Sequence, residues 1–264
     1  MNSIEHKIIW ITGASSGIGE ALAYQLNGLG AKTILSARRN TELERVKNNC
    51  KFPTNVAVLP LDLTNFHELE TMPKKALSFY GEIDILINNG GISQRSLIKD
   101  TSIKVYQELI NVNYLGTIQL TRCLLPYFME RKSGHFVTIT SLMGKFSSPF
   151  RSGYCGAKHA LHGFFDALRM EHEKDQINVT LICPGFVQTN VAKNALVGDG
   201  NSSKREDEAT KNGVTADFCA KKIIEAIRNK RFEVAIGGKE KYGVYLKRFF
   251  PILLHKLVLK SKVR

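Results

Sequence analysis

Short apolar runs rich in β-branched residues alternate along the chain with longer stretches in which apolar residues recur every three or four positions. Most of the short runs carry apolar residues on both alternating faces, which is typical of parallel strands that are covered on both faces. The intervals between the runs are long enough for crossover helices. Seven strands are predicted, at residues 7–12, 32–37, 55–62, 83–88, 135–140, 178–183 and 232–237. We therefore expect an α/β fold with one doubly wound sheet of about seven parallel strands and helices on both faces.

One long polar segment, residues 193–217, departs from this alternation. It contains glycines and charges of both signs, so it predicts a long mobile loop ahead of a helix near residues 218–228. Loops of this length often act as lids, and a disordered surface insertion is the alternative.

Residues 239–264 form a basic, amphipathic extension. Apolar side chains recur at helical spacing from Leu246 to Leu257, and eight Lys and Arg residues stand against one Glu. Pro251 interrupts any single long helix and predicts two short ones. Such a segment can cover a pocket or pack against a second subunit, contact a membrane surface, or remain solvated, and the sequence leaves these alternatives open.

The composition restricts the class of protein. A chain of 264 residues can bury a core that is stable without disulfides or metals. Its five cysteines are widely spaced and form no C-x-x-C pair, so neither a disulfide framework nor a zinc site is predicted. The N-terminus shows no signal peptide, and no apolar stretch approaches the roughly 18 residues of a spanning helix. We expect a cytoplasmic protein, with peripheral membrane contact through the extension as an open alternative.

A glycine-rich turn joins the first predicted strand to the first helical stretch. The segment reads TGASSGIGEALAYQL, with the spacing T-G-x-x-x-G-x-G. Glycines let the backbone approach a pyrophosphate closely, and the N–H groups at a helix start bind an anion without a charged side chain. The residues expected to bind a dinucleotide here are Gly13, Ser15, Ser16, Gly17, Ile18 and Gly19.

The second predicted strand ends in LSARRN, which places Arg38 and Arg39 where a dinucleotide fold that prefers NAD usually carries an Asp or Glu. A carboxylate there would repel a 2′-phosphate, whereas a guanidinium can bind it through charge-assisted hydrogen bonds. NADP(H) is therefore the favoured cofactor. The alternative is that both arginines are solvated at a helix start.

Two further strand ends are candidate parts of the same cofactor site. Asp62 and Leu63 close the third strand, where an adenine ring could rest and its amino group could meet the carboxylate. An N-cap role for Asp62 or Thr64 is the alternative. Asn89 and Gly90 lie in INNGG at the end of the fourth strand, and could hold adjacent strands while leaving backbone open to the cofactor.

The segment GYCGAK places Tyr154 and Lys158 one turn apart on the same face of a predicted helix. Hydride transfer to or from a carbon that bears oxygen needs a proton donor or acceptor. A tyrosine has an unperturbed pKa of about 10, and a nearby ammonium group favours its phenolate form. Ser141 follows the fifth predicted strand, and its hydroxyl could orient the substrate oxygen, although a serine there is more often a turn or cap residue.

In their order along the chain, these motifs resemble those of the short-chain dehydrogenase/reductase superfamily over about residues 7–237. TGASSGIG resembles the family's cofactor turn, and NNGG resembles its N-N-A-G strand end with Gly90 in place of Ala. NVNYLG resembles its helical asparagine segment, ITS followed by YCGAK its active site, and PGFVQT the segment that contacts the nicotinamide end. The resemblance implies a Rossmann-type fold.

The resemblance also implies a role for each matched residue. Tyr154 would be the catalytic acid or base, Ser141 would stabilise the substrate oxygen, and Lys158 would bind the nicotinamide ribose and lower the pKa of Tyr154. Asn113 would hold a water that links the lysine to solvent as a proton relay. The residues that would hold the nicotinamide carboxamide are Pro184, Gly185, Val187 and Thr189.

Within the superfamily, the stretch GKFSSPFRSGYCGAKHALHGFFDALRMEHE is most similar to members of the hydroxysteroid dehydrogenase and acyl-dihydroxyacetone phosphate reductase type. We therefore expect an oxidoreductase that transfers a hydride between NADP(H) and a carbonyl or secondary alcohol of a lipophilic, steroid-, retinoid- or acyl-ketone-like substrate. A catalytically idle NADP(H)-binding protein that regulates a partner is the alternative. Family members commonly pair, which implies a homodimer or homotetramer, and neither a metal nor a nucleic acid is expected.

The predicted domain organisation follows from these assignments. Residues 1–238 would form the NADP-binding domain, which includes the catalytic site and a substrate loop at 193–217, and residues 239–264 would form the extension. The loops expected to build the substrate pocket are 93–100, 142–153 and 186–217.

Overall fold

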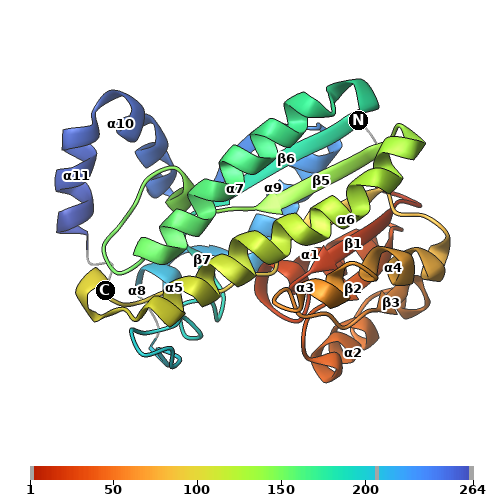
Figure 1. Cartoon of the computed structure of the whole chain (residues 1–264), viewed down its shortest axis with the longest axis horizontal. Coiled ribbons are helices and arrows are strands. Elements are labelled where there is room, and N and C mark those ends of the chain that lie inside the picture. The colour runs from red at the N-terminus through yellow and green to blue at the C-terminus, as the bar shows by residue number, and fades with distance from the viewer. Residues whose placement is uncertain (1–2, 206–207, 262–264) are drawn as a thin grey trace.

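A seven-stranded parallel sheet forms the centre of the protein, whose computed structural model describes residues 3–205 and 208–261 (Figure 1). The strand order is β3-β2-β1-β4-β5-β6-β9. The strands of this sheet are β1 (Ile8–Thr12), β2 (Lys32–Ser36), β3 (Val56–Val58), β4 (Ile85–Asn88), β5 (Gly134–Ile139), β6 (Ile177–Pro184) and β9 (Glu233–Ile236). A separate two-stranded sheet pairs β7 (Val187–Gln188) with β8 (Val214–Thr215). The predicted doubly wound sheet of seven parallel strands is confirmed, with a third strand shorter than expected.

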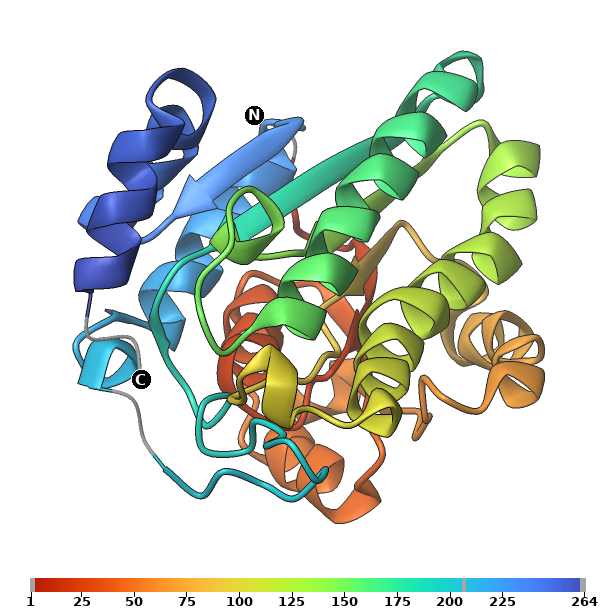
Figure 2. The ribbon, with the colours of Figure 1, turned by 60° about the vertical axis from the view of Figure 1, so that its left-hand side comes forward.

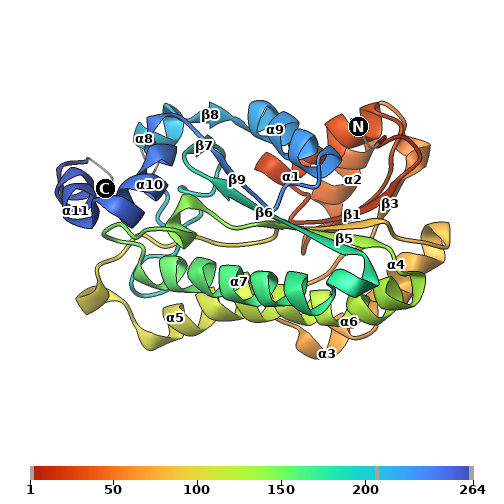
Figure 3. The same cartoon turned by 90° about the horizontal axis from the view of Figure 1, so that it is seen from above.

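Helices cover both faces of the sheet. Figure 3 shows α1, α2 and α9 on one face and α3 to α7 on the other, so that the molecule has three layers. The helices are α1 (Gly17–Gly28), α2 (Asn40–Asn48), α3 (Phe66–Leu69), α4 (Met72–Tyr80), α5 (Ile103–Ile110), α6 (Gly116–Arg131), α7 (Ser152–Glu171), α8 (Glu208–Lys211), α9 (Ala216–Arg228), α10 (Gly243–Phe249) and α11 (Pro251–Lys260).

The side chains of β1 explain why this strand is apolar at successive positions. Ile9 and Ile11 are buried in the core beneath α1 and α9. Ile8 and Trp10 are buried in a second core beneath α4, α6 and α7. Because alternate side chains of a strand point to opposite faces, a strand between two helical layers must be apolar on both.

The strand order reverses between β1 and β4, and this reversal opens a crevice at the carboxyl ends of the strands. β1 continues into α1 on one face of the sheet, whereas β4 leads to α5 and α6 on the other. Because the two connections leave in opposite directions, the strand ends between them stay uncovered. Doubly wound proteins bind their ligands at this point.

The chain between α5 and α6 widens into a π-helical segment, Asn111–Leu115. In a π turn the hydrogen bonds join residues five apart, and such turns within helices are frequent at functional sites. This segment brings the fully buried Asn113 to the crevice.

Residues 193–217 contain regular elements where the sequence predicted a mobile loop. Leu196 forms a β-bridge with Gln94, and the segment also contains α8 and β8. Residues 206 and 207 lie outside the described part of the segment. The helix predicted near 218–228 is α9, which begins slightly earlier.

The C-terminal extension folds into two short helices, α10 and α11, as Pro251 predicted. Pro251 is the first residue of α11, where a missing backbone N–H breaks no helical hydrogen bond. Figure 2 shows the two helices next to the end of β9. Residues 262–264 of the extension lie outside the described residues. Within the part of the chain that is described, no helix is long and apolar enough to cross a membrane.

Candidate active site

A cavity of about 910 Å³ lies at the carboxyl ends of the strands. Its walls come from the ends of β1, β2, β4, β5 and β6, from α7, and from the C-terminal extension. The predicted site residues that line it are Asn113, Ser141, Tyr154, Lys158, Gly13, Ser15, Ser16, Gly17, Ile18, Arg38, Arg39, Asp62, Leu63, Asn89, Gly90, Pro184, Gly185, Val187 and Thr189. Gly19 was also expected in this site, and it lies outside the cavity lining.

Gly19 lies beneath the glycine turn. A Cβ atom at this position would be 2.3 Å from the Gly13 carbonyl oxygen and 2.6 Å from Asn89 Nδ2. Gly13 and Gly17 have φ angles of +63° and +59°, which other residues rarely adopt. The glycines therefore allow a turn so tight that backbone, rather than side chains, faces the cavity at the start of α1.

Hydrogen bonds between the ends of β1 and β4 hold this turn in place. Thr12 Oγ1 accepts hydrogen bonds from the backbone N–H groups of Asn89 and Gly90, both at 3.0 Å. The Asn89 side-chain amide donates to the carbonyl oxygens of Thr12 and Gly13, both at 3.1 Å. Asn89 holds adjacent strands together, as predicted, and its partner is Thr12, the threonine of the T-G-x-x-x-G-x-G motif.

Arg38 and Arg39 follow β2 and are exposed at the rim of the cavity. Arg39 occupies the N-cap position of α2. Two guanidinium groups at the rim make this end of the cavity electrostatically favourable for an anionic group.

Asp62 lines the cavity next to the end of β3, and its carboxylate is partly engaged. Asp62 Oδ1 accepts hydrogen bonds from Thr64 N at 2.9 Å and from Thr64 Oγ1 at 2.8 Å, which closes an Asx turn. The N-cap of α3 is Asn65, whose Oδ1 accepts from Glu68 N at 3.3 Å. The alternative that Asp62 or Thr64 caps this helix is therefore wrong.

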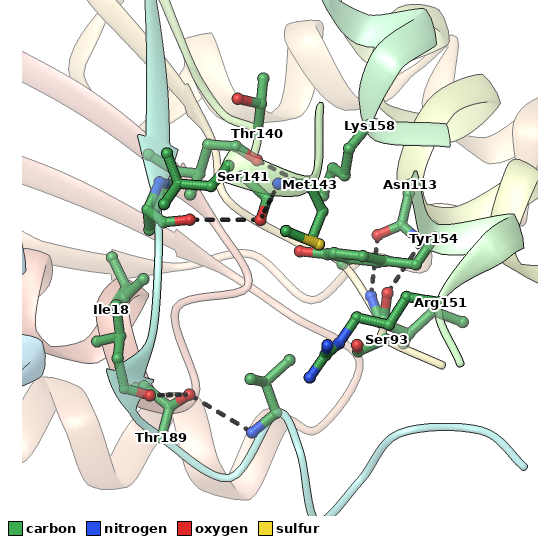
Figure 4. Close-up of a pocket in the computed structure, with 18 of the residues that line it drawn as sticks. Ile18, Ser93, Asn113, Thr140, Ser141, Met143, Arg151, Tyr154, Lys158 and Thr189 are labelled. Carbon is green, nitrogen blue, oxygen red and sulfur yellow. Dashed lines mark hydrogen bonds between the residues drawn. The ribbon is translucent and has the colours of Figure 1, made fainter. Parts of the chain in front are cut away.

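Tyr154 and Ser141 meet beyond the end of β5. Figure 4 shows the Tyr154 hydroxyl, on the first turn of α7, pointing toward Ser141. Ser141 Oγ accepts a hydrogen bond from Met143 N at 3.1 Å and donates to the Pro184 carbonyl oxygen at 3.3 Å. Burial raises the pKa of Tyr154, and a hydrogen bond with Ser141 opposes this. The structure thus places two hydroxyl groups where both can reach one ligand oxygen.

Lys158 lies one helical turn after Tyr154, as the spacing predicted. Its Nζ atom is 5.7 Å from the centroid of the Tyr154 ring and donates a hydrogen bond to the Ile139 carbonyl oxygen at 2.8 Å. Burial lowers the pKa of Lys158 to about 8. The ammonium group is therefore still favoured at neutral pH.

Asn113 lies next to Lys158, across the backbone of Gly91. Asn113 Oδ1 accepts a hydrogen bond from Ile92 N, and its Nδ2 donates to the carbonyl oxygens of Ile92 and Leu109, each at 3.0 Å. A Cβ atom on Gly91 would be 2.6 Å from Asn113 Oδ1 and 3.6 Å from Lys158 Nζ. The π-helical segment therefore brings Asn113 to the other predicted catalytic residues.

The segment after β6 crosses the cavity opposite the glycine turn. A Cβ atom on Gly17 would be 3.0 Å from Thr189 Cγ2, so Thr189 lies directly over the turn. A Cβ atom on Gly185 would be 2.4 Å from Glu240 Oε1, which also accepts a hydrogen bond from Gly238 N at 3.0 Å. Glu240 therefore ties the start of the extension to this wall.

Comparison with known proteins agrees with this geometry. A family model described as short chain dehydrogenase matches residues 7–198. The chain belongs to the short-chain dehydrogenase/reductase family. It is accordingly an oxidoreductase of the kind that binds a nicotinamide cofactor.

Several relatives support this assignment. The human "Dehydrogenase/reductase SDR family member 7" is 46% identical over 251 residues, which cover 92% of this chain and 74% of that protein. A "Dehydrogenase/reductase SDR family protein 7-like" from Drosophila melanogaster is 38% identical over 271 residues, covering 100% of this chain and 82% of its own. A solved short-chain dehydrogenase from Streptomyces avermitilis superposes with a TM-score of 0.82 at 25% identity, over 96% of both chains. A Burkholderia phymatum family member in complex with NAD shares the fold, with a TM-score of 0.85 at 23% identity over 96% of both chains.

In this short-chain dehydrogenase/reductase, the C-terminal extension forms part of the cavity wall. Leu254 of α11 packs with Leu142 and Phe146, which follow β5, in one buried cluster. A Cβ atom on Gly243 of α10 would be 2.8 Å from the Phe146 ring. Of the alternatives that the sequence left open for the extension, covering the pocket is one that the structure shows.

Two arginines that sequence reasoning did not name line the cavity near Tyr154. Arg151 is only 4% exposed, and its Nη1 donates to Ser148 Oγ at 2.9 Å. Arg95 Nη1 donates to Ser93 Oγ at 3.0 Å. The charges of both arginines lower the pKa of Tyr154. Both lie in loops that were expected to build the pocket, but no local pattern distinguishes an arginine in a cavity from one in solvent.

Replacing Gly19 by Ala should weaken binding of a nicotinamide dinucleotide, because the new methyl group would have to displace the Gly13 carbonyl. Such overpacking costs about 1–3 kcal/mol. Because the turn would relieve the overlap by moving away from the geometry that holds the cofactor, we expect the Kd to rise by about 5- to 150-fold. Isothermal titration calorimetry measures the Kd. Gly28→Ala, at the end of the same helix with no atom within 4 Å of the new Cβ, is the control and should bind normally. Equal affinities of the two variants would contradict this account of the turn.

Proposed function

We propose that this protein catalyses NADP(H)-dependent hydride transfer to a carbonyl group of a lipophilic substrate, or from the corresponding secondary alcohol. The observation that carries the proposal is the convergence of Ser141, Tyr154 and Lys158 in the cavity that the glycine turn also lines. Hydride transfer at a carbon that bears oxygen needs a proton donor or acceptor within reach of that oxygen. This group of side chains can provide one.

The crevice fits a dinucleotide. The turn at Gly13 and Gly17 presents backbone where a pyrophosphate would lie, and the start of α1 provides N–H groups for it. Thr189, on the opposite wall, would contact the nicotinamide end. When bound, the nicotinamide donates or accepts the hydride. Arg38 and Arg39 at the rim would bind the 2′-phosphate that distinguishes NADP(H) from NAD(H).

The proton would move through Tyr154. Burial raises the pKa of its phenol, so the group holds a proton at neutral pH and can donate it during reduction. Ser141 would hold the substrate oxygen by a hydrogen bond while this oxygen gains negative charge. The Lys158 ammonium, 5.7 Å from the ring centroid, would then stabilise the phenolate in its poorly solvated site. Asn113 would hold the water through which the proton returns.

The wall formed by the extension supports a lipophilic substrate. Phe146, Leu246, Leu254 and Leu257 all line the cavity, and Phe146 and Leu254 belong to one apolar cluster. Apolar substrate surface that is removed from water against this wall contributes about 25 cal/mol per Å². A steroid, a retinoid or a long acyl ketone offers such a surface, whereas a small polar carbonyl compound does not.

The outer side of the extension supports contact with an anionic membrane surface. Phe249, Phe250 and Ile252 are 68%, 62% and 73% exposed, and the basic Lys247 and Arg248 precede them. Helices that expose apolar and basic side chains together bind at the interface of anionic bilayers. Because the same helices form a wall of the cavity, a lipophilic substrate could pass from the bilayer into the site along them.

Replacing Arg38 and Arg39 together by Ala should weaken binding of NADPH and leave that of NADH unchanged. A hydrogen bond to a charged group is worth about 1.5–3 kcal/mol, so the Kd for NADPH should rise by about 10- to 100-fold. Calorimetric titration of both cofactors measures the effect. Arg122→Ala, on the exposed side of α6, is the matched control. An equal loss for the two cofactors, or a wild-type protein that uses NADH as efficiently as NADPH, would show that the preference is wrong.

Replacing Tyr154 by Phe should remove turnover while cofactor binding is retained, because only the proton donor is lost. A positioned general acid contributes about 10²- to 10⁴-fold, so we expect kcat to fall by at least about 100-fold. NADPH oxidation with a panel of steroid, retinoid and acyl ketones measures turnover. Tyr80→Phe, on α4, should retain full activity. If the wild-type protein binds NADPH but turns over no member of the panel, the regulatory alternative replaces this proposal.

Replacing Phe249 and Ile252 together by Ser should release the protein from anionic vesicles. A fully buried apolar side chain contributes about 1.5–3 kcal/mol, so we expect the partition constant to fall by about 10-fold or more. Flotation with vesicles of phosphatidylcholine with and without phosphatidylserine measures binding. Phe79→Ser, on α4 at the opposite end of the molecule, is the control and should still float (Figure 1). Absence of flotation with the wild-type protein would overturn the proposed membrane contact.

A further inference from the structure

Three metal-binding side chains from separate elements meet behind the Ser141 turn. His162 lies on α7, Cys183 on β6 and Glu233 on β9, and one ligand atom of each lies within 4.8 Å of the others. His162 Nε2 is 3.8 Å from Cys183 Sγ, and His162 Nδ1 is 3.4 Å from Glu233 Oε2. His162 and Cys183 are buried, whereas Glu233 lies at the surface. These residues have no part in the proposed reaction.

We propose that His162, Cys183 and Glu233 form a binding site for Zn²⁺. An imidazole, a thiolate and a carboxylate are the three ligand types that zinc takes in proteins, and three protein ligands leave the fourth position open. The thiolate and imidazole select zinc over Mg²⁺ and Ca²⁺, which prefer oxygen ligands.

The geometry requires the Glu233 carboxylate to move. With bonds of about 2.0–2.3 Å, the ligands of a tetrahedral zinc ion lie about 3.3–3.8 Å apart. Zinc binds one imidazole nitrogen, and His162 Nε2 lies 3.8 Å from Cys183 Sγ, close to this range. Glu233 Oε2 lies 3.4 Å from the other ring nitrogen, Nδ1, so its carboxylate must move toward the Nε2 side, within a set of ligand atoms that lie within 4.8 Å of one another. Glu233 has a side chain that is 36% exposed, so it can move to complete the set.

A cation of the protein itself, Lys145, now pairs with the Glu233 carboxylate. Lys145 Nζ lies 2.6 Å from Glu233 Oε2 and 3.5 Å from His162 Nδ1. The Lys145 side chain is 24% exposed, so its ammonium group can swing into solvent. Zinc would compete with Lys145 for the carboxylate.

The exchange balances in charge and involves no redox change. A cysteine buried in apolar surroundings is a thiol, so the cluster now holds the Cys183 thiol, the His162 ring, the Glu233 carboxylate and the Lys145 ammonium. Zinc would form bonds to sulfur, nitrogen and oxygen, the thiol proton would pass to solvent, and the ammonium would leave. The thiol proton and the Lys145 ammonium each take one positive charge away from the cluster, and the zinc ion brings two.

The cluster contacts the turn that carries Ser141. Thr140 Oγ1 lies 3.3 Å from Cys183 Sγ. A Cβ atom on Gly144 would be 2.9 Å from His162 Nε2, and Lys145 is the next residue along the chain. Movement of Cys183 and His162 toward a bound zinc ion would therefore shift the turn that holds Ser141. Zinc would then inhibit turnover. This consequence rests on the proposed function, whereas the binding site itself does not.

Zinc binding to the full-length protein is measured by competition with a chromophoric chelator, and Co²⁺ serves as a spectroscopic probe. We expect one equivalent of zinc and a thiolate-to-cobalt charge-transfer band. Cys183→Ala should remove the band and weaken zinc binding by about 100-fold, whereas Cys219→Ala, a buried cysteine on α9, should retain both. A band of wild-type intensity in Cys183→Ala would overturn the proposal.

Two milder variants test the site if Cys183→Ala does not fold. Glu233→Gln should weaken zinc binding by about 10-fold or more, because it removes an anionic ligand. Lys145→Met should tighten it by about 10-fold, because it removes the competing cation. Unchanged affinity in both variants would overturn the site.

The effect on turnover is measured separately. Wild-type turnover should fall when zinc is added, and Glu233→Gln should need a higher zinc concentration for the same loss. Binding without inhibition would retain the zinc site and contradict its coupling to Ser141. A protein without any measurable turnover would count against the proposed function alone, because the binding measurement does not depend on it.

Discussion

The hydrogen bonds between Thr12 and Asn89 join the carboxyl ends of β1 and β4 at the point where the strand order reverses. They satisfy backbone groups at the strand ends, which would otherwise need a covering element. The carboxyl ends of β1 and β4 can therefore stay uncovered and open to the cavity. Gly13 and Gly19 pack against Asn89 without side chains of their own, and the start of α1 faces the cavity. The other residues of the candidate site line the cavity that opens at this junction.

Two side chains of the candidate site are fixed by nearby backbone groups. Ser141 is held between Met143 N and the Pro184 carbonyl, and Lys158 by the Ile139 carbonyl. Such anchoring orients the groups before a substrate arrives, which lowers the cost of reorganising them during the reaction. The same burial that orients Tyr154 and Lys158 shifts their pKa values in opposite directions, because it disfavours the charged form of each.

Two peripheral features converge on the turn that follows β5. The extension packs Leu254 against Leu142 and Phe146, so this wall of the cavity and the Ser141 turn share one apolar cluster. On the other side, Lys145 pairs with Glu233 of β9. The position of Ser141 is therefore linked to two elements that lie far from it along the chain.

The sequence by itself determined the sheet, the glycine turn and the pairing of Tyr154 with Lys158. These features depend on local spacing: a strand between two helical layers must be apolar on both faces, and residues four apart share one face of a helix. Only the tertiary structure decided that the extension lines the cavity, that Arg95 lies near Tyr154, and that His162 meets Cys183. These contacts join segments distant in sequence, and they depend on how whole elements pack, which no local periodicity encodes.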